Sequence, residues 1–231
     1  MTYGEYFFID YGLPLLGVII TAIAQISISI NYSRYKEERV KSKMTGCETA
    51  RKILDSNGLE NVKINRVSGK LTDHYDPRNK TINLSEDIYD GKSISSVSVA
   101  AHECGHAIQD KEGYSFLRIR SALVPFVNFS SKIGYLVVFI GLILNALNLA
   151  RFGIILLLVI LLFQLVTLPV EFNASNRAKK QLVALNITTA EEKKGTRKVL
   201  TAAALTYVAS LLSTLFQILR LALIVANRKD D

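Results

Sequence analysis

Residues 152–170 read FGIILLLVILLFQLVTLPV and carry no charged side chain. About 20 apolar residues in a helix cross the ~30 Å hydrocarbon core of a bilayer. A helix in a soluble protein normally keeps a polar face, and this stretch has none. It therefore predicts a transmembrane helix and indicates an integral membrane protein.

Three further stretches are uncharged and long enough to span a bilayer, namely residues 11–33, 133–150 and 199–219. The first lacks the basic start and the small-residue cleavage site of a secretory signal, so we expect it to remain as an anchor. The second forms a hairpin with residues 152–170. The last is richer in Ala, Ser and Thr, and it is either a fourth span or an amphipathic helix packed on the others.

The formal net charge is +8, and the basic residues lie mainly beside the apolar stretches. They are Arg34, Lys36, Arg39, Lys41 and Lys43 after the first stretch, and Arg177, Lys179 and Lys180 after the third. This distribution follows the positive-inside rule, and basic segments beside a span also favour anionic lipid. The charge therefore indicates a lipid bilayer as partner and argues against nucleic acid.

The same rule predicts the topology. The first ten residues contain Glu5 and Asp10 but no Lys or Arg, so we expect the N-terminus outside and residues 34–132 in the cytoplasm. Arg228 and Lys229 fit this topology less well, because a fourth full span places them outside.

Residues 45–59 predict a helix in the cytoplasmic segment. Thr45 and Glu48 have the spacing of a capping box, and Gly58 ends the helix. The two cysteines, Cys47 and Cys104, give no disulfide framework, and a reducing compartment agrees with the cytoplasmic assignment.

Residues 62–86 alternate in polarity, are rich in β-branched side chains and contain two turn signals. They predict two or three short strands, the last over residues 81–84. A short helical segment follows, and then Ser93 or Ser95 caps a helix that carries residues 97–109. This part of the chain is therefore a small α+β domain.

The capped helix contains HECGH, residues 102–106. Residues i and i+4 share a helix face, so His102 and His106 can present their imidazoles to one cation, with Glu103 turned toward the water on it. Zinc suits imidazole and carboxylate ligands, and Glu103 would be the general base. Cys104 is expected to be a small buried residue and not a ligand.

The third ligand has two candidates. Glu171 follows the strongest apolar stretch directly, and Pro169 with the change to polar residues suggests that a new helical segment begins there. His74 is the competing ligand, and it otherwise suits a cleft residue that binds substrate or stabilises the oxyanion. Each candidate also has a non-functional interpretation. Glu171 would be a solvated residue at a helix start, and His74 would be a structural residue of a turn.

HECGH followed by a membrane hairpin and EFNAS resembles the membrane-embedded gluzincin metallopeptidases of the HtpX type, which have HExxH and a later ExxAD. Five stretches resemble the YugP-type neutral zinc metallopeptidases of prokaryotic membranes more closely: LTDHYDPR, AAHECGHAIQ, SALVP, QLVTLPVEFNASNRA and AALTYVA. The resemblance runs from Thr45 to about Ser210. It implies zinc (Zn2+) bound by His102, His106 and Glu171, with Glu103 catalytic.

One position departs from the HtpX-type pattern. Ser175 stands where that pattern has Asp, four residues after the ligand Glu. An outer carboxylate often orients a ligand histidine, so Ser175, Asn173 or another residue must do so here. In YugP-type proteins Ser is the expected residue.

The implied reaction is hydrolysis of a peptide bond, with Glu103 passing the proton of water to the leaving amine. His74, or else Tyr207, is expected to stabilise the oxyanion. Arg177 either pairs with a substrate carboxylate or serves as a positive-inside charge. The strand near residues 71–77 offers an edge to an extended peptide.

Two other functions compete with this one. A non-catalytic membrane adaptor or scaffold would retain a structural zinc site, but such a site needs no base beside its ligand, and Glu103 is one. A site-2-type intramembrane protease would have HExxH within a span, whereas HECGH lies between DGKS and QDKEG. We therefore expect a protease with its active site at the membrane surface.

The expected fold is a mainly α integral membrane protein, multi-pass in the cell membrane, with a small zincin-like domain facing the cytoplasm. Its parts are a transmembrane anchor (1–33), the cytoplasmic zincin-like domain (34–132), a transmembrane hairpin (133–170), a helix with the third ligand (171–198) and a hydrophobic helix with tail (199–231). The substrate is a peptide or membrane protein. An accessory membrane protein and a homo-oligomer stay open.

Overall fold

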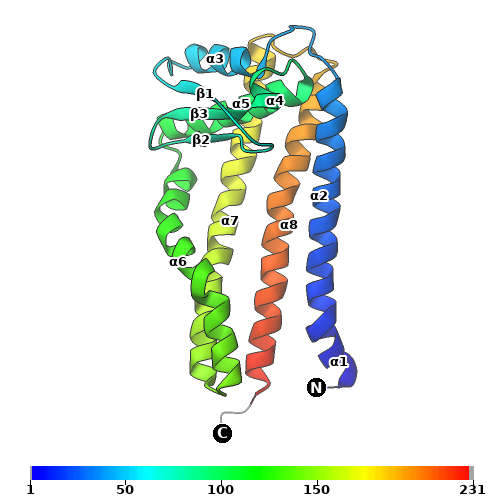
Figure 1. The fold of residues 1–231 in the computed structure, drawn as a ribbon, viewed down its shortest axis with the longest axis vertical. Helices are drawn as coiled ribbons and strands as arrows, with labels where there is room; N and C mark the ends of the chain where they lie inside the picture. Colours follow the sequence, from blue (N-terminus) through cyan, green and yellow to red (C-terminus); the bar gives the residue numbers. More distant parts are fainter. Residues whose placement is uncertain (1, 229–231) are drawn as a thin grey trace. The chain divides into compact units, whose positions relative to one another are not determined.

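The computed structural model describes residues 2–228 (Figure 1). Its elements are α1 (Tyr3–Phe7), the π-helix η1 (Phe8–Gly12), α2 (Leu13–Glu37), α3 (Gly46–Ser56), β1 (Lys63–Val67), β2 (His74–Asp76), β3 (Thr81–Ser85), α4 (Glu86–Tyr89), α5 (Ile94–Lys111), α6 (Ser115–Ile143), α7 (Leu147–Ala184) and α8 (Lys193–Ala226). The chain forms two compact units. The apolar unit consists of Met1–Gln25, Arg118–Leu168 and Thr206–Asp231, and the polar unit consists of Ile26–Leu117 and Pro169–Leu205.

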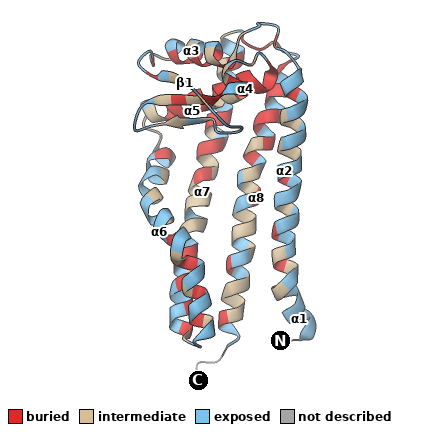
Figure 2. Ribbon diagram, viewed as in Figure 1, coloured by how far each residue is buried: buried red, intermediate tan, exposed pale blue. Residues whose placement is uncertain are grey.

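The polar unit has its core around α5. The side chain of Ser93 caps this helix by accepting a hydrogen bond from the backbone N–H of Ser96. Helix α3 and the sheet pack against α5, and Figure 2 shows buried residues concentrated in α5. The core includes Ile53, Leu54, Ile82, Leu84, Val97, Ala101 and Leu182.

Helix α3 confirms the predicted helix over residues 45–59. Thr45 Oγ1 accepts from the Glu48 backbone N–H at 3.1 Å, and Glu48 Oε2 accepts from the Thr45 N–H at 2.7 Å. Gly58 has φ +64, the left-handed conformation that ends helices. Local capping chemistry thus determines both ends of this helix.

The sheet has the strand order β1-β3-β2 (Figure 1). β1 pairs with β3 in parallel, β2 pairs with β3 antiparallel, and His74 lies opposite Asn83. The predicted last strand over residues 81–84 corresponds to β3. β2 is therefore an edge strand of the described sheet, with one side free of strand partners.

Gly105 allows α5 and α7 to approach each other closely. A Cβ built at Gly105 would lie 2.5 Å from the backbone oxygen of Ala174. The backbone of one helix thus occupies the space that a side chain would need on the other. This contact brings the HECGH segment against residues 171–175.

In the apolar unit, α6 and α7 are joined by a tight turn at Asn145, which has φ 52. Small residues let the two helices pack closely, as in membrane helix pairs. A Cβ at Gly134 would lie 2.8 Å from Leu157, and one at Gly153 would lie 2.6 Å from Val138. The predicted hairpin is therefore present.

Within residues 2–228, four helical stretches are long and apolar enough to cross a membrane: Tyr3–Glu37, Ser115–Ile143, Leu147–Ala184 and Lys193–Ala226. Many of their large apolar side chains are exposed, as Figure 2 illustrates. Exposed apolar surface of this extent is expected where lipid is the solvent. The last stretch meets the same criteria as the others, which favours a fourth span over an amphipathic helix.

Two predicted boundaries differ from the structure. Helix α7 continues through Pro169, so no new segment begins at Glu171; proline is tolerated inside apolar helices when other groups take up the freed carbonyls. Helix α6 begins at Ser115, well before residue 133. Its first turns are amphipathic, so the sequence pattern placed them in the cytoplasmic domain. Lys229, part of the predicted tail, lies outside the described residues.

The close approach of α5 and α7 makes Gly105→Ala destabilising. Overpacking against backbone typically costs about 1–3 kcal/mol, which corresponds to a melting midpoint lower by about 2–12 °C for a chain of this size. The measurement is thermal unfolding of the detergent-purified protein. Gly4→Ala is the matched control, because a Cβ there meets nothing within 4 Å. Equal midpoints for the two variants would show that α5 and α7 are not in tight contact.

Candidate metal centre

Three side chains of the polar unit converge on one point. His102 and His106 come from α5 and Glu171 comes from α7, and each offers a ligand atom within 4.8 Å of the others. Glu171 Oε2 lies 3.2 Å from His102 Nε2 and 3.6 Å from His106 Nε2. The structure thus brings together the two histidines of HECGH and the candidate that follows the apolar stretch.

These distances fit a tetrahedral zinc ion. Zinc bonds of about 2.0–2.2 Å place neighbouring ligand atoms ~3.4 Å apart. Two imidazole nitrogens and one carboxylate oxygen form a donor set that zinc accepts, with the fourth position left for water. Glu171 is only 2% exposed. A carboxylate buried this deeply requires cationic or hydrogen-bonding partners, and the site supplies them.

Gln109 orients His106, a role that the sequence did not predict. His106 Nδ1 lies 3.0 Å from Gln109 Oε1. The other end of the amide donates to the backbone oxygen of Val170 at 2.8 Å, which fixes which atom is oxygen. His106 Nδ1 must therefore carry the proton, and Nε2 is left with a lone pair facing Glu171. The only signal in the sequence was the position of Gln109, three residues after His106 on the helix.

Ser175 contacts the other histidine. Its Oγ lies 3.2 Å from His102 Nδ1, so the residue at the departure from the HtpX-type pattern does meet a ligand. If Nε2 were to bind a metal ion, Nδ1 would carry the proton and donate a hydrogen bond to this hydroxyl. A neutral hydroxyl thus occupies the place of the outer carboxylate of the HtpX-type pattern, as expected for a YugP-type chain.

Asn173 extends the hydrogen-bond network from Gln109 to the surface of the polar unit. Its Oδ1 accepts from Gln109 Nε2 at 3.0 Å and from Arg177 Nε at 2.7 Å. Arg177 then pairs through both terminal nitrogens with Glu112, at 2.8 and 2.6 Å. Because Arg177 is engaged in this bidentate pair, its structural partner is Glu112, which argues against the alternative of a substrate carboxylate.

Glu103 is buried on α5, with 7% of its surface exposed. Among residues 2–228 the structure gives its carboxylate no hydrogen bond and no ion pair. A nearly buried carboxylate without a protein partner is unusual. The side chain is therefore unengaged next to His106, as a group that exchanges protons with water and substrate must be.

Electrostatics in the site favour a cation. Burial by itself lowers the pKa of His106, but hydrogen bonds to Glu171 and Gln109 and the charges of Glu171 and Glu103 outweigh it, and the pKa lies above its ordinary value. A metal ion competes with this proton for Nε2, so metal binding tightens as pH rises. The site therefore attracts positive charge, whether a proton or a metal ion.

Cys104 faces away from the candidate ligands. Its Sγ contacts the backbone oxygen of Ala50 on α3, and burial raises the pKa of the thiol well above its ordinary value. A thiol held protonated in an apolar core does not bind metal. This agrees with the prediction that Cys104 is a small buried residue.

His74 is not brought into the cluster. Tyr75, its neighbour on β2, donates to Asp110 of α5, and successive strand residues point to opposite faces, so His74 lies on the exposed face of the sheet. Its ring nitrogens contact Thr72 O at 2.7 Å and Asn83 Nδ2 at 3.1 Å. The geometry therefore favours Glu171, the expected third ligand, over the competing candidate His74. A role in binding substrate stays a prediction that this orientation argues against.

Tyr207, the other predicted oxyanion donor, lies on α8 and is exposed. It belongs to the apolar unit, whereas the candidate ligands belong to the polar unit. Its role stays a prediction.

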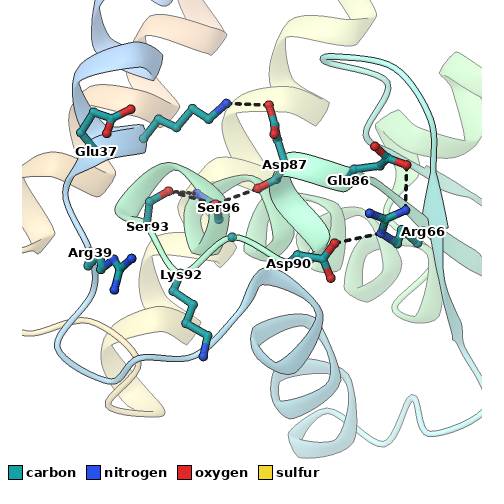
Figure 3. A pocket seen from close by; sticks show the side chains of 11 residues that line it. Glu37, Arg39, Arg66, Glu86, Asp87, Asp90, Lys92, Ser93 and Ser96 are labelled. Carbon is teal, nitrogen blue, oxygen red and sulfur yellow. Dashed lines mark hydrogen bonds and ion pairs between the residues drawn. The ribbon is translucent and has the colours of Figure 1, made fainter.

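A cavity of about 760 Å³ lies elsewhere in the polar unit, where α2 ends beside α4 and the start of α5 (Figure 3). Its charged side chains largely pair with each other, as Lys36 with Asp87 and Arg66 with Glu86 and Asp90. None of the three candidate ligands lines it. The cavity is therefore separate from the metal centre.

Comparison with known proteins identifies the family of this chain. Residues 11–226 match the family described as "Putative neutral zinc metallopeptidase". The chain is 48% identical over 208 residues to the "Putative membrane protease YugP" of Bacillus subtilis strain 168, covering 90% of this chain and 92% of that protein. No solved structure matches the chain.

The orientation of His106 makes Gln109→Leu costly for metal binding. Loss of an outer hydrogen bond to a ligand histidine typically lowers metal affinity about 10–100-fold, and we expect this loss in a zinc competition assay against a chelator. Gln109→Glu keeps the acceptor for His106 and should retain more affinity than Gln109→Leu.

Gln181→Leu is the matched control, because Gln181 also lies on α7 but bonds Asn57, outside the site. Parent-like affinity in Gln109→Leu would mean that the hydrogen bond does not position His106.

Proposed function

The chain belongs to the family described as "Putative neutral zinc metallopeptidase", and we propose that it is a membrane-bound zinc endopeptidase acting at the cytoplasmic face. The observation that carries the proposal is the meeting of His102, His106 and Glu171 beside an unpaired Glu103. A zinc site with a free carboxylate next to one ligand matches the needs of metal-assisted hydrolysis. The site is of the gluzincin type, and the polar unit serves as its zincin-like domain.

The three ligands would hold zinc, which supplies Lewis acidity and activates water when bound. Glu103 takes a proton from the attacking water and gives it to the leaving amine, so that the peptide bond breaks without a charged amide anion. Gln109 and Ser175 keep the Nδ1 protons of the histidines in place during this exchange. Each residue therefore has one task, and only Glu103 exchanges a proton.

β2 is a candidate for binding the substrate backbone. It is an edge strand, antiparallel to β3, and it packs against α5, the helix that carries HECGH. An extended peptide can add to such an edge through backbone hydrogen bonds, which require little sequence specificity. The proposed substrate is an unfolded peptide or an extended segment of a membrane protein.

The proposed location is the cell membrane, with the polar unit in the cytoplasm. The basic residues between positions 34 and 43 and between 177 and 180 support this topology. If all four candidate spans cross the membrane, both termini lie outside the cell. Arg228 is then the basic residue that agrees least with the positive-inside rule.

A membrane adaptor with a structural zinc site is the second candidate. Structural zinc sites are normally closed by four protein ligands, whereas the described cluster has three. A closed structural site does not need a general base, so the unpaired Glu103 would have no function there. The geometry therefore favours hydrolysis.

Two variants separate metal binding from turnover. Glu171→Ala removes one of three ligands and should reduce zinc from about one ion per chain to a small fraction, measured by elemental analysis of the purified protein. Glu103→Gln should retain zinc but lose at least about 100-fold of the cleavage rate on disordered casein, the usual range for loss of a general base.

Glu192→Gln serves as control, because Glu192 caps the start of the α8 region and lies outside the site. Zinc retained in Glu171→Ala would place the third ligand elsewhere. Cleavage retained in Glu103→Gln with full zinc would refute the assigned base.

Cys47 provides a built-in probe of the topology. It is half-buried, whereas Cys104 is fully buried. A membrane-impermeant maleimide should label Cys47 only after spheroplasts are permeabilised, and it should label Gly4→Cys in a Cys47→Ala background before permeabilisation. The reverse pattern would place the metal centre outside the cell.

A further inference from the structure

The apolar unit contains a groove with one charged residue. The groove has a volume of about 510 Å³ and is lined by Lys132, Tyr135, Leu136, Val138, Phe139 and Leu142 of α6 and by Leu221 of α8. Leu136 is 54% exposed and Phe139 62% exposed. The groove is therefore apolar and open on one side, with a single lysine in its lining.

In the structure Lys132 lies near the middle of the part of α6 that follows Arg120 and ends at Ile143, not at the end of a span as residues 133–150 alone suggested. Packing of α6 on α7 pairs Gly134 with Leu157 and Gly153 with Val138, which puts Lys132 level with about Val159 of α7. With a rise of 1.5 Å per residue, Val159 lies about 18 Å along α7 from Glu171 and about 18 Å from the start of α7 at Leu147. If the uncharged stretch spans the bilayer, the lysine is at mid-depth.

The apolar unit does not neutralise this charge. Residues 118–168 and 206–228 contain no Asp or Glu, and Asp10 pairs with Arg220 at 3.9 Å. No hydrogen bond or ion pair to Lys132 is found in the part of the chain that the structure describes. A charged side chain inside a membrane is costly and normally faces a partner. The groove therefore lacks a negative group to pair with Lys132, and another molecule must supply it.

The depth of Lys132 distinguishes between the possible sources of that group. Lipid phosphates lie about 15 Å from the bilayer centre, whereas a lysine side chain extends only about 6 Å. A second copy of this chain has no carboxylate on residues 118–168 or 206–228 to offer. A carboxylate on a different transmembrane helix can lie at the required depth.

We propose that this groove binds a transmembrane helix of another membrane protein that carries an Asp or Glu near the middle of its span. Lys132 pairs with that carboxylate, and Leu136, Phe139 and Leu142 pack on the apolar side chains next to it. Tyr135 donates to Gln217 Oε1 at 2.6 Å, which ties α6 to α8 and holds the groove in shape. The partner is therefore selected by an acidic residue at a defined depth.

The test uses the full-length protein in phosphatidylcholine vesicles at pH 8 and two synthetic 21-residue Leu/Ala helices, one with a central Asp and one with a central Asn. Association is measured by energy transfer between labels. The parent should bind the Asp helix about tenfold more tightly than the Asn helix, the order of an interhelical polar pair. In Lys132→Met that preference should disappear while binding of the Asn helix is unchanged.

Phe139→Ala is the companion variant. It should weaken the binding of both synthetic helices equally, because it removes apolar contact only. Equal binding of the two helices by the parent, or an Asp preference that persists in Lys132→Met, would overturn the proposal. Loss of the preference when phosphatidylglycerol is added would also overturn it, and would assign Lys132 to a lipid phosphate. None of these readouts depends on zinc or peptidase activity, so the result stands apart from the proposed function.

Discussion

The close approach of α5 and α7 is the constraint on which the polar unit depends. Gly105 has no side chain where the Ala174 backbone passes, and Gln109 donates from α5 to the Val170 backbone on α7. With the helices held at this distance, His102 and His106 meet Glu171 although the ligands are far apart in sequence. A larger residue at position 105 would separate the two halves of the site before any ligand was changed.

The orienting groups of the site are neutral. Many zinc sites use a carboxylate to hold a ligand histidine, whereas here an amide contacts His106 and a hydroxyl contacts His102. The negative charge of the site thus comes from Glu171 and Glu103 alone. Further out, Asn173 and Arg177 connect the amide to Glu112, so the charged groups of this network lie at its outer end, where solvent reduces the cost of desolvation.

Local signals predicted much of the secondary structure. The capping box at Thr45, the left-handed Gly58 and the alternation in residues 62–86 act within a few residues, and α3 and β3 follow them closely. The break expected at Pro169 was wrong, because α7 runs without interruption from Leu147 to Ala184 and the local loss of one backbone hydrogen bond at a proline does not end it. The start of α6 at Ser115 was missed because its first turns mix basic and apolar residues.

Hydropathy and i, i+4 spacing are properties of the chain, so the amino-acid sequence was sufficient to predict the four apolar stretches, the HECGH helix and two candidate histidine ligands. Residue types alone allowed Glu171 or His74 as third ligand, and the family resemblance favoured Glu171. The physical reason for this choice comes from the fold, since Tyr75 turns toward α5 and His74 turns away from the candidate ligands. The role of Gln109 also required the fold, because a glutamine becomes an orienting group only when another helix supplies the backbone oxygen that fixes its amide.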